Sequence, residues 1–368
     1  ITLLLRVNTV FYKIENWYNV IQFMNEAKLL ERLVSTFDGD IIRLLAESST
    51  NGYYRIVKLL LADSRASPEA CNYAIKMASK YGHVEVVKLL LADSRADPEA
   101  CDYAIGTASH NGHDKIVELL LKDPRTDPAA NDNYAIKLSA FNGHDKVVKL
   151  LLKDPRIDPG AEDNYAIETA SQNDHAEIVE LLLKDHRVDP TAENNYAIGI
   201  AAQNGYLKIV KLLLKDPRID PTADNNTVIK LVSTKGHDKI VELLLADSRI
   251  DPGADDNFCI RIASQNGHIE VVKLLLAYSR TDPGADDNYA IKIASQNGHT
   301  EVVILLLKSL GHRFNIITYA KFPTEIPHYI KELLINHIIK YRWAMKMFIS
   351  QHLTIDLLNQ INHFIVTN

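Results

Sequence analysis

The sequence predicts an all-α solenoid built from helix-turn-helix pairs, and two observations predict it. A small residue, nearly always the glycine of an Asn-Gly-His phrase, recurs every 30 or 31 residues along most of the 368-residue chain. Between these positions, apolar residues fall in two short blocks at helical spacing. Self-similarity at this period is typical of a solenoid, in which each unit buries its apolar face only against its neighbours. The nine anchor positions are Gly52, Gly82, Gly112, Gly143, Asp174, Gly205, Gly236, Gly267 and Gly298.

One unit, residues 72–95, shows how the helices are predicted. Its two apolar blocks lie on either side of Gly82, and residues three or four positions apart share one face of a helix. The first face comprises Ala74, Ile75 and Ala78, and the second comprises Val86, Val87, Leu90 and Leu91. The glycine is expected to adopt the left-handed backbone that ends the first helix, with Asp174 as a tolerable substitute.

Polar residues mark the ends of the helices in each unit. An asparagine precedes the first helix, where its side-chain oxygen is expected to cap free backbone N–H groups. An Asp-Pro pair follows the second helix, and the proline blocks further helix. The asparagines are Asn72, Asn133, Asn164, Asn195, Asn226, Asn257 and Asn288, with Asp102 replacing one.

The phrase GHxEVVKLLL followed by an Asp-Pro loop resembles the ankyrin repeat, and the resemblance covers about residues 40–308. The usual Thr-Pro-Leu-His-x-Ala-Ala opening is replaced by Tyr-Ala-Ile-x-x-Ala-Ser, as in residues 289–295. Each unit is also two or three residues shorter than the family's typical 33. We therefore expect short inter-repeat loops in place of projecting β-fingers. This variant is similar to the ankyrin arrays of amoebae and of the large DNA viruses that infect them.

Composition narrows the class of protein. The chain is 46% apolar and 24% charged, and its net charge of -6 comes with interspersed signs, so no basic face indicates nucleic acid. No apolar run reaches the roughly 18 residues needed to span a bilayer. Cys71, Cys101 and Cys259 form no CxxC pair, which favours reduced structural thiols. We expect a monomeric cytoplasmic protein, located in the host cytoplasm if the source is viral.

An arginine, a histidine and a tyrosine each recur about once per unit. An arginine lies between the two Asp positions of DxRxDP, and an anion-binding stripe is one interpretation of this row. We favour pairing with a carboxylate of the same or the next unit, which would fasten the loops together. Tyr278 replaces the first Asp in one unit and should weaken that contact. The arginines are Arg65, Arg95, Arg125, Arg156, Arg187, Arg218, Arg249 and Arg280.

A histidine opens most second helices, and neighbouring imidazoles should lie about 10 Å apart, too far to share a metal ion with bonds of about 2 Å. A tyrosine begins most first helices and is expected to pack under the loops, because no basic residues interleave to form a base-stacking platform. The histidines are His83, His113, His144, His175, His237, His268 and His299, and the tyrosines are Tyr73, Tyr103, Tyr134, Tyr165, Tyr196 and Tyr289.

No GxSxG, HExxH, P-loop or dinucleotide motif is present in the sequence. The sequence therefore predicts no enzyme, no cofactor and no metal. Binding must then depend on positions where the units differ. In ankyrin arrays the first helix and the loop line the concave face, so the resemblance places partner contacts there.

Two variable positions are the candidates, counted back from the anchor residue of each unit. Phe141 is the sharpest of them, because an aromatic in an otherwise polar row is typical of a binding hot spot. A solitary exposed aromatic without a role is the alternative. Position −6 gives Lys76, Lys137, Glu168, Lys230, Arg261 and Lys292, with Gly106 and Gly199 in two units. Position −2 gives Lys80, His110, Phe141, Gln172, Gln203, Gln265 and Gln296, with Thr234 in one unit.

The ends of the chain do not follow the period. Residues 1–39 and 309–368 are expected to cap the open apolar ends of the array, residues 325–349 forming one or two amphipathic helices. Residues 3–14, LLLRVNTVFYKI, also resemble the closing half of an F-box, the motif that docks on the Skp-type adaptor of a cullin ubiquitin ligase. Residues 322–334 weakly resemble an F-box opening, as in poxviral ankyrin proteins, although Pro327 lies inside the expected helix. The chain begins with Ile, which suggests a fragment of a longer reading frame.

These observations predict a non-catalytic scaffold that binds a protein partner on the concave ankyrin surface. The alternative is a substrate receptor that delivers a captured partner to a cullin-type ubiquitin ligase through a terminal F-box. A nucleic-acid binder or an enzyme is a third interpretation, which a steep salt dependence of DNA or RNA binding would favour. The sequence does not identify the partner.

Overall fold

The structure, a computed structural model, describes residues 41–314, 319 and 326–352. The expected F-box remnant at residues 1–39 lies outside this range, and so do residues 322–325 of the second F-box echo. The chain divides into two compact units, residues 1–189 and 190–368, and each is considered by itself.

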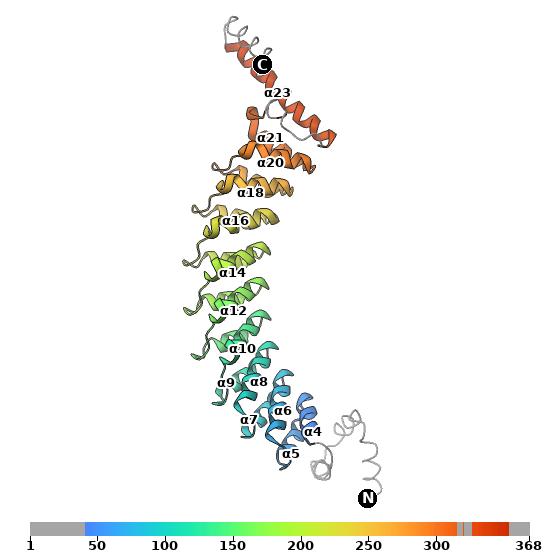
Figure 1. The fold of residues 1–368 in the computed structure, drawn as a ribbon, viewed down its shortest axis with the longest axis vertical. Coiled ribbons are helices and arrows are strands. Elements are labelled where there is room, and N and C mark those ends of the chain that lie inside the picture. The colour runs from blue at the N-terminus through green and yellow to red at the C-terminus, as the bar shows by residue number, and fades with distance from the viewer. Residues whose placement is uncertain (1–40, 315–318, 320–325, 353–368) are drawn as a thin grey trace, which may run out of the picture. The chain divides into compact units, whose positions relative to one another are not determined.

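The described part of unit 1, residues 41–189, contains five helix pairs that follow one another in chain order (Figure 1). First helices pack on first helices, as α6 does on α4 and α8. The pairs are α4 (Ile41–Thr50) with α5 (Tyr54–Leu61), α6 (Pro68–Lys80) with α7 (Val84–Ala92), α8 (Pro98–His110) with α9 (Asp114–Lys122), α10 (Ala130–Phe141) with α11 (Asp145–Leu151), and α12 (Ala161–Gln172) with α13 (Ala176–Leu183).

Unit 2 repeats the arrangement and adds a longer C-terminal helix. Its pairs are α14 (Ala192–Gln203) with α15 (Leu207–Leu214), α16 (Ala223–Lys235) with α17 (Asp238–Leu245), α18 (Ala254–Gln265) with α19 (Ile269–Leu276), and α20 (Ala285–Gln296) with α21 (Thr300–Leu310). A 3₁₀ turn, η1 (Gly311–Arg313), and α23 (His328–His352) follow.

The core is the one that the apolar periodicity predicts. Ala74, Ile75 and Ala78 of α6 are fully buried, and so are Val87 and Leu90 of α7. Leu91, which the pattern places on the same face, is only half-buried. No strand occurs within the described ranges, and the inter-repeat loops there consist of turns. The prediction of an all-α helix-turn-helix solenoid with short loops is confirmed.

The turn between the helices of a pair favours glycine for two reasons, which Gly143 illustrates. Its φ of 80° lies in the left-handed region, where other residues are strained. A Cβ placed on Gly143 would also come within 2.7 Å of the ring of His175 in the next repeat, so a side chain has no room. Asp174 adopts the same backbone, with φ 61°, as the sequence predicts for this substitute.

Repeats of two lengths begin their first helices differently. In α6 and α8, the proline of the Ser-Pro or Asp-Pro pair starts a right-handed helix directly, and the preceding side chain caps it: Ser67 Oγ accepts from the Ala70 N–H, and Asp97 Oδ1 accepts from the Ala100 N–H. We call these the short repeats. They have four residues between the proline and the tyrosine of the first helix, whereas the other repeats have five.

In the other repeats, which we call the long repeats, the extra residue lies in a segment where three consecutive residues form one turn of left-handed helix. In α10, Asn131, Asp132 and Asn133 all have φ between 52° and 60°, and the Asn133 N–H donates to the Ala129 carbonyl to close the turn. Asn and Asp are the residues that tolerate this conformation best after glycine. The corresponding triplets begin α12, α14, α16, α18 and α20, and apart from Glu162 and Glu193 they consist only of Asn and Asp.

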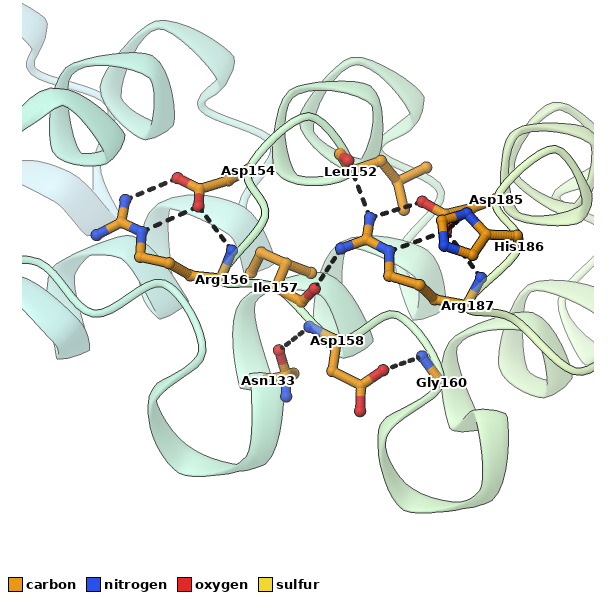
Figure 2. A network of polar contacts seen from close by, with 10 residues as sticks. All are labelled: Asn133, Leu152, Asp154, Arg156, Ile157, Asp158, Gly160, Asp185, His186 and Arg187. Atoms are coloured by element: carbon orange, nitrogen blue, oxygen red, sulfur yellow. Dashed lines mark hydrogen bonds and ion pairs between the residues drawn. The ribbon is translucent and has the colours of Figure 1, made fainter.

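The asparagines thought to cap the first helices have another role. Asn133 lies inside the left-handed turn, and its Oδ1 accepts a hydrogen bond from the Asp158 N–H of the next repeat at 2.7 Å (Figure 2). Asn72 accepts in the same way from the Asp97 N–H at 2.9 Å. The capping prediction was wrong because the caps of the short repeats are Ser67 and Asp97, one turn earlier. Most of the asparagines instead tie consecutive loops together, although the buried Oδ1 of Asn195 has no hydrogen-bond partner within the described residues.

The C-terminal helix packs on the last repeat. Ile330 and Leu334 of α23 are fully buried, whereas Ile335 and Ile339 are exposed. Tyr329 places its hydroxyl 3.4 Å from the Gly298 carbonyl, close to where the Cβ of residue 298 would lie. In the other repeats of unit 2 a histidine ring fills the corresponding place.

Candidate functional site

The recurring arginines bind groups inside the protein. Arg187 forms a forked pair with Asp185 of its own loop, through Nε to Oδ1 at 2.9 Å and Nη2 to Oδ2 at 2.6 Å (Figure 2). Its Nη1 and Nη2 also donate to two carbonyls of the preceding repeat, Ile157 at 2.7 Å and Leu152 at 3.1 Å. The carboxylate contact is within one repeat, and the contacts between repeats go to main-chain oxygens.

The same arrangement occurs in a short repeat. Arg125 pairs with Asp123 and donates to the carbonyls of Ala96 and Leu91. Hydrogen bonds from the guanidinium lower the pKa of Asp123 and of Asp185 below the usual range, and they raise the pKa of each arginine. These groups are saturated with internal partners, which disfavours an anion-binding stripe.

Tyr278 compensates for the missing aspartate of its repeat. Its hydroxyl donates to the carbonyl of Leu245, the position that corresponds to Leu152 in the Arg187 contact. Arg280 Nη2 donates to the Ser248 carbonyl at 3.4 Å. The expected weakening of this loop contact is therefore offset by a hydrogen bond from the tyrosine.

The recurring histidines are also internal. His175 Nε2 lies 3.0 Å from the Phe141 carbonyl of the preceding repeat, and since a carbonyl only accepts, the imidazole donates from Nε2. His83 binds the Thr50 carbonyl in the same way at 2.8 Å. Each ring covers the glycine of the preceding repeat. These contacts assign the histidines to packing between repeats.

The predicted partner-binding residues lie on one face of the first helices. Positions −6 and −2 lie three and seven residues after position −9 on the helix, so the three positions share a face. We call this the first-helix face. In unit 1 it comprises Tyr73, Lys76, Lys80, Tyr103, Gly106, His110, Tyr134, Lys137, Phe141, Tyr165, Glu168 and Gln172. In unit 2 it comprises Tyr196, Gly199, Gln203, Thr227, Lys230, Thr234, Phe258, Arg261, Gln265, Tyr289, Lys292 and Gln296.

Position −2 is open to solvent. Lys80, His110, Phe141 and Gln172 are exposed, and Phe141 has 44% of its surface accessible. In unit 2, Gln296 is exposed while Gln203, Thr234 and Gln265 are half-buried. Most main-chain carbonyls at this position accept a hydrogen bond from a histidine, and the side chains of this position in unit 1 contribute to the protein surface.

Position −6 is less accessible, because its charged side chains bind carboxylates of the left-handed turns. Lys137 is 7% exposed and pairs with Glu162 of the next repeat at 2.8 Å. Lys230 pairs with Asp255 and Arg261 with Asp286, while Lys292 pairs with Asp287 of its own repeat. These residues are half-buried, apart from the buried Lys137.

The tyrosines at position −9 are the surface residues that the sequence interpretation missed. They do not pack under the loops, as expected, but expose 36% to 51% of their surfaces. Two of the rings lie against the −6 cation of the preceding repeat: Lys76 Nζ is 4.8 Å from the centre of the Tyr103 ring, and Arg261 lies 5.5 Å from that of Tyr289. Their fixed distance of nine residues before each anchor was the signal that could have placed them on the face.

Within the described ranges, no group of three or more His, Cys, Asp or Glu residues is arranged to hold a metal ion. The three cysteines are buried free thiols. Burial raises the pKa of Cys101 and of Cys259 to about 11, so neither is activated as a nucleophile.

The family model for ankyrin repeats, described as three copies, matches five overlapping segments: residues 43–132, 75–163, 105–194, 167–257 and 229–318. Together these segments cover most of the chain.

The chain belongs to the ankyrin repeat family.

A comparison with curated proteins found no match. Ankyrin repeats generally mediate protein–protein interaction, so a protein partner is the expected ligand of this chain. No helix of the described part is both long and apolar enough to cross a membrane.

Proposed function

We propose that this ankyrin repeat protein is a non-catalytic scaffold that binds a protein partner on the first-helix face, which is the concave face of ankyrin arrays. A cytoplasmic location and a monomeric state are part of the proposal. The observation that supports it most is the contrast between recurring and variable positions. Most of the recurring Arg, His and Asn residues form hydrogen bonds between repeats, whereas the side chains at position −2 of the first-helix face in unit 1 are exposed.

Phe141 is the proposed anchor of the partner. It is the one aromatic side chain at position −2, and 44% of its surface is exposed on α10. It lies on the same helix face as the exposed Tyr134. Exposed aromatics grouped on a polar face are typical of the residues that dominate binding energy in protein interfaces.

The test is selection of binders from a random 12-residue peptide library displayed on phage, with the full chain as bait. The variant Phe141→Ala should bind the selected peptides at least about tenfold more weakly, since hot-spot truncations cost upwards of ~1.4 kcal/mol. Tyr54→Ala is the matched control, because Tyr54 is a similarly exposed aromatic on the second helix α5.

Both variants should melt at the wild-type temperature. Selected peptides that bind wild type, Phe141→Ala and substitutions at Lys80, His110 and Gln172 with equal affinity would contradict the proposal, because their site would lie elsewhere.

The second candidate is a substrate receptor of a cullin-type ubiquitin ligase. The observation that favours it is the F-box-like segment of residues 3–14, and an origin among amoebae or large DNA viruses would fit this role. Co-purification of a Skp-type adaptor with the full chain, lost when residues 3–14 are deleted, would support it. Sequence upstream of the codon for Ile1 should then contain Leu-Pro-x-Glu in frame, and an unrelated sequence there would count against it.

A further inference from the structure

Lys76 differs from the other cations at position −6. Lys137, Lys230, Arg261 and Lys292 each pair with a carboxylate at 2.5 to 3.0 Å. Lys76 has no carboxylate within ion-pair distance among the residues that the structure describes, and its ammonium group lies over the ring of Tyr103 instead. Its charge is therefore not neutralised within the described part of the protein.

The cause is the length of the next repeat. Lys137, Lys230 and Arg261 pair with the first residue of the left-handed turn that follows. Lys76 is followed by the short repeat of α8, which begins with Pro98 and has no left-handed turn. The residue that would carry the carboxylate is missing from the sequence.

A second cation lies one turn further along the same face. Lys80 is exposed, and its Nζ lies 5.4 Å from the centre of the Tyr81 ring, again without a carboxylate in the described ranges. Tyr73, Tyr81 and Tyr103 are each about half exposed around these two lysines. We call Tyr73, Lys76, Lys80, Tyr81 and Tyr103 the short-repeat patch.

The carboxylates of these two helices are Glu69 and Glu99, which lie in the first turns, and Asp102, which follows the first turn of α8. Glu69 precedes Lys76 by seven residues, which is about 10 Å along the helix, and its pKa is lowered by a hydrogen bond with Ser67. Asp102 is half-buried and accepts a hydrogen bond from the Asp127 N–H. Glu69 and Asp102 are engaged at the loop edge, and neither Lys76 nor Lys80 forms an ion pair within the described ranges, so the patch carries two unpaired positive charges.

We propose that the short-repeat patch binds an acidic segment of the protein partner. Its carboxylates would lie at Lys76 and Lys80, and an apolar side chain would pack against the rings of Tyr73 and Tyr103. The inference rests on the proposed scaffold function and adds the chemistry of the partner. Charge complementarity carries it: the chain as a whole is acidic, with net charge -6, yet this part of the face is cationic and aromatic.

A nucleic acid fits the patch less well. A phosphate backbone needs a continuous basic track, whereas the same face continues from α8 to Gly106 and His110 and then to the neutralised Lys137 and to Glu168. Two ammonium groups flanked by tyrosines suit a short acidic peptide.

The test uses the full chain and the phage-displayed library of random 12-residue peptides. Peptides retained by the wild type should be enriched in Asp and Glu relative to the input library. A synthetic copy of an enriched peptide should bind at least tenfold more weakly to the double variant Lys76→Glu/Lys80→Glu, and its affinity should fall as salt is raised. Lys76→Arg/Lys80→Arg should retain binding.

The matched control is Lys88→Glu/Lys115→Glu. It makes the same change in net charge in the same unit, on the exposed surfaces of α7 and α9, and should change affinity less than twofold. Circular dichroism should show wild-type helix content for every variant.

The outcomes separate the two proposals. Peptides that are not enriched in acidic residues, or that bind the Lys76/Lys80 reversal normally but lose affinity for Phe141→Ala, would overturn the acidic-segment inference and leave the scaffold function standing. Peptides whose affinity is unchanged by every substitution on the first-helix face would overturn both proposals. Tighter binding of a uridine oligonucleotide than of any acidic peptide, or a dimer of the chain that the reversal dissociates, would also overturn the inference.

Discussion

The short and long repeats of unit 1 bury the same faces of their helices, but a long repeat has one more residue between the proline and the tyrosine. In both, the arginine binds its own aspartate and carbonyls of the preceding repeat, three for Arg125 and two for Arg187. In the short repeat, Asp97 caps a right-handed helix. In the long repeat, Asp158 instead accepts a hydrogen bond from the Gly160 N–H, and a left-handed turn follows (Figure 2).

The difference teaches how an insertion changes a surface without disturbing a core. The extra residue is absorbed in the left-handed turn, so the buried positions of both helices stay in register. The turn also brings a carboxylate to the cation of the preceding repeat, as Glu162 does for Lys137. The length of a repeat therefore determines whether the cation at position −6 of the preceding repeat has a carboxylate partner. Lys137 has one, and Lys76 does not.

The largest expected effect comes from forcing a β-branched residue into the left-handed turn. Asn133→Val should lower the free energy of unfolding by about 3 kcal/mol, because valine is strained at a φ of 60° and the hydrogen bond to the Asp158 N–H is lost. Asn72→Val in the short repeat should cost only about 1 kcal/mol, since its backbone is right-handed. Urea denaturation measures both, and equal losses would refute the assigned role of the turn.

Replacing a recurring arginine by alanine should cause a somewhat smaller loss of stability, and the loss should be the same in both kinds of repeat. Arg125→Ala and Arg187→Ala should each cost about 2 kcal/mol, because each side chain is about a quarter exposed and makes charged hydrogen bonds to one carboxylate and to at least two carbonyls. Thermal melting of the two variants provides the comparison. A variant that melted normally but lost its partner would instead assign that arginine to binding.

Stability should also depend on pH through these pairs. The pKa of Asp123 and of Asp185 is lowered in the folded protein by the partner arginine, while the unfolded value is near 3.9. Their contribution is therefore fully present above about pH 4 and is lost as pH falls through the lower folded pKa. Asp185→Asn should flatten the decline of the urea midpoint between pH 5 and pH 2, and Asp123→Asn should do the same. An unchanged decline in both variants would show that other carboxylates control it.

The sequence predicted the helices and the core because the apolar spacing and the glycine turn act within one unit. It also placed Phe141 and its row on an exposed surface. The pairing of Lys137 was not predictable in this way, because it depends on a left-handed turn in the next repeat, and the segment Asn131–Asn133 looks like an ordinary polar loop. The exposure of Tyr103 was missed for a related reason: its ring lies under the ammonium group of Lys76 on a neighbouring helix, and a single unit does not show that contact.

The most direct test of the account is to convert the short repeat into a long one. Residues 98–102, Pro-Glu-Ala-Cys-Asp, would be replaced by the six residues of positions 159–164, Pro-Gly-Ala-Glu-Asp-Asn, so that a turn glutamate reaches Lys76 as Glu162 reaches Lys137. The control carries Gln in place of that Glu. The affinity of a selected acidic peptide, measured by fluorescence anisotropy, should fall about fivefold with the glutamate, since a partly exposed ion pair is worth up to ~1 kcal/mol. It should stay near wild type with the glutamine, and equal affinity for both grafted proteins would contradict the account.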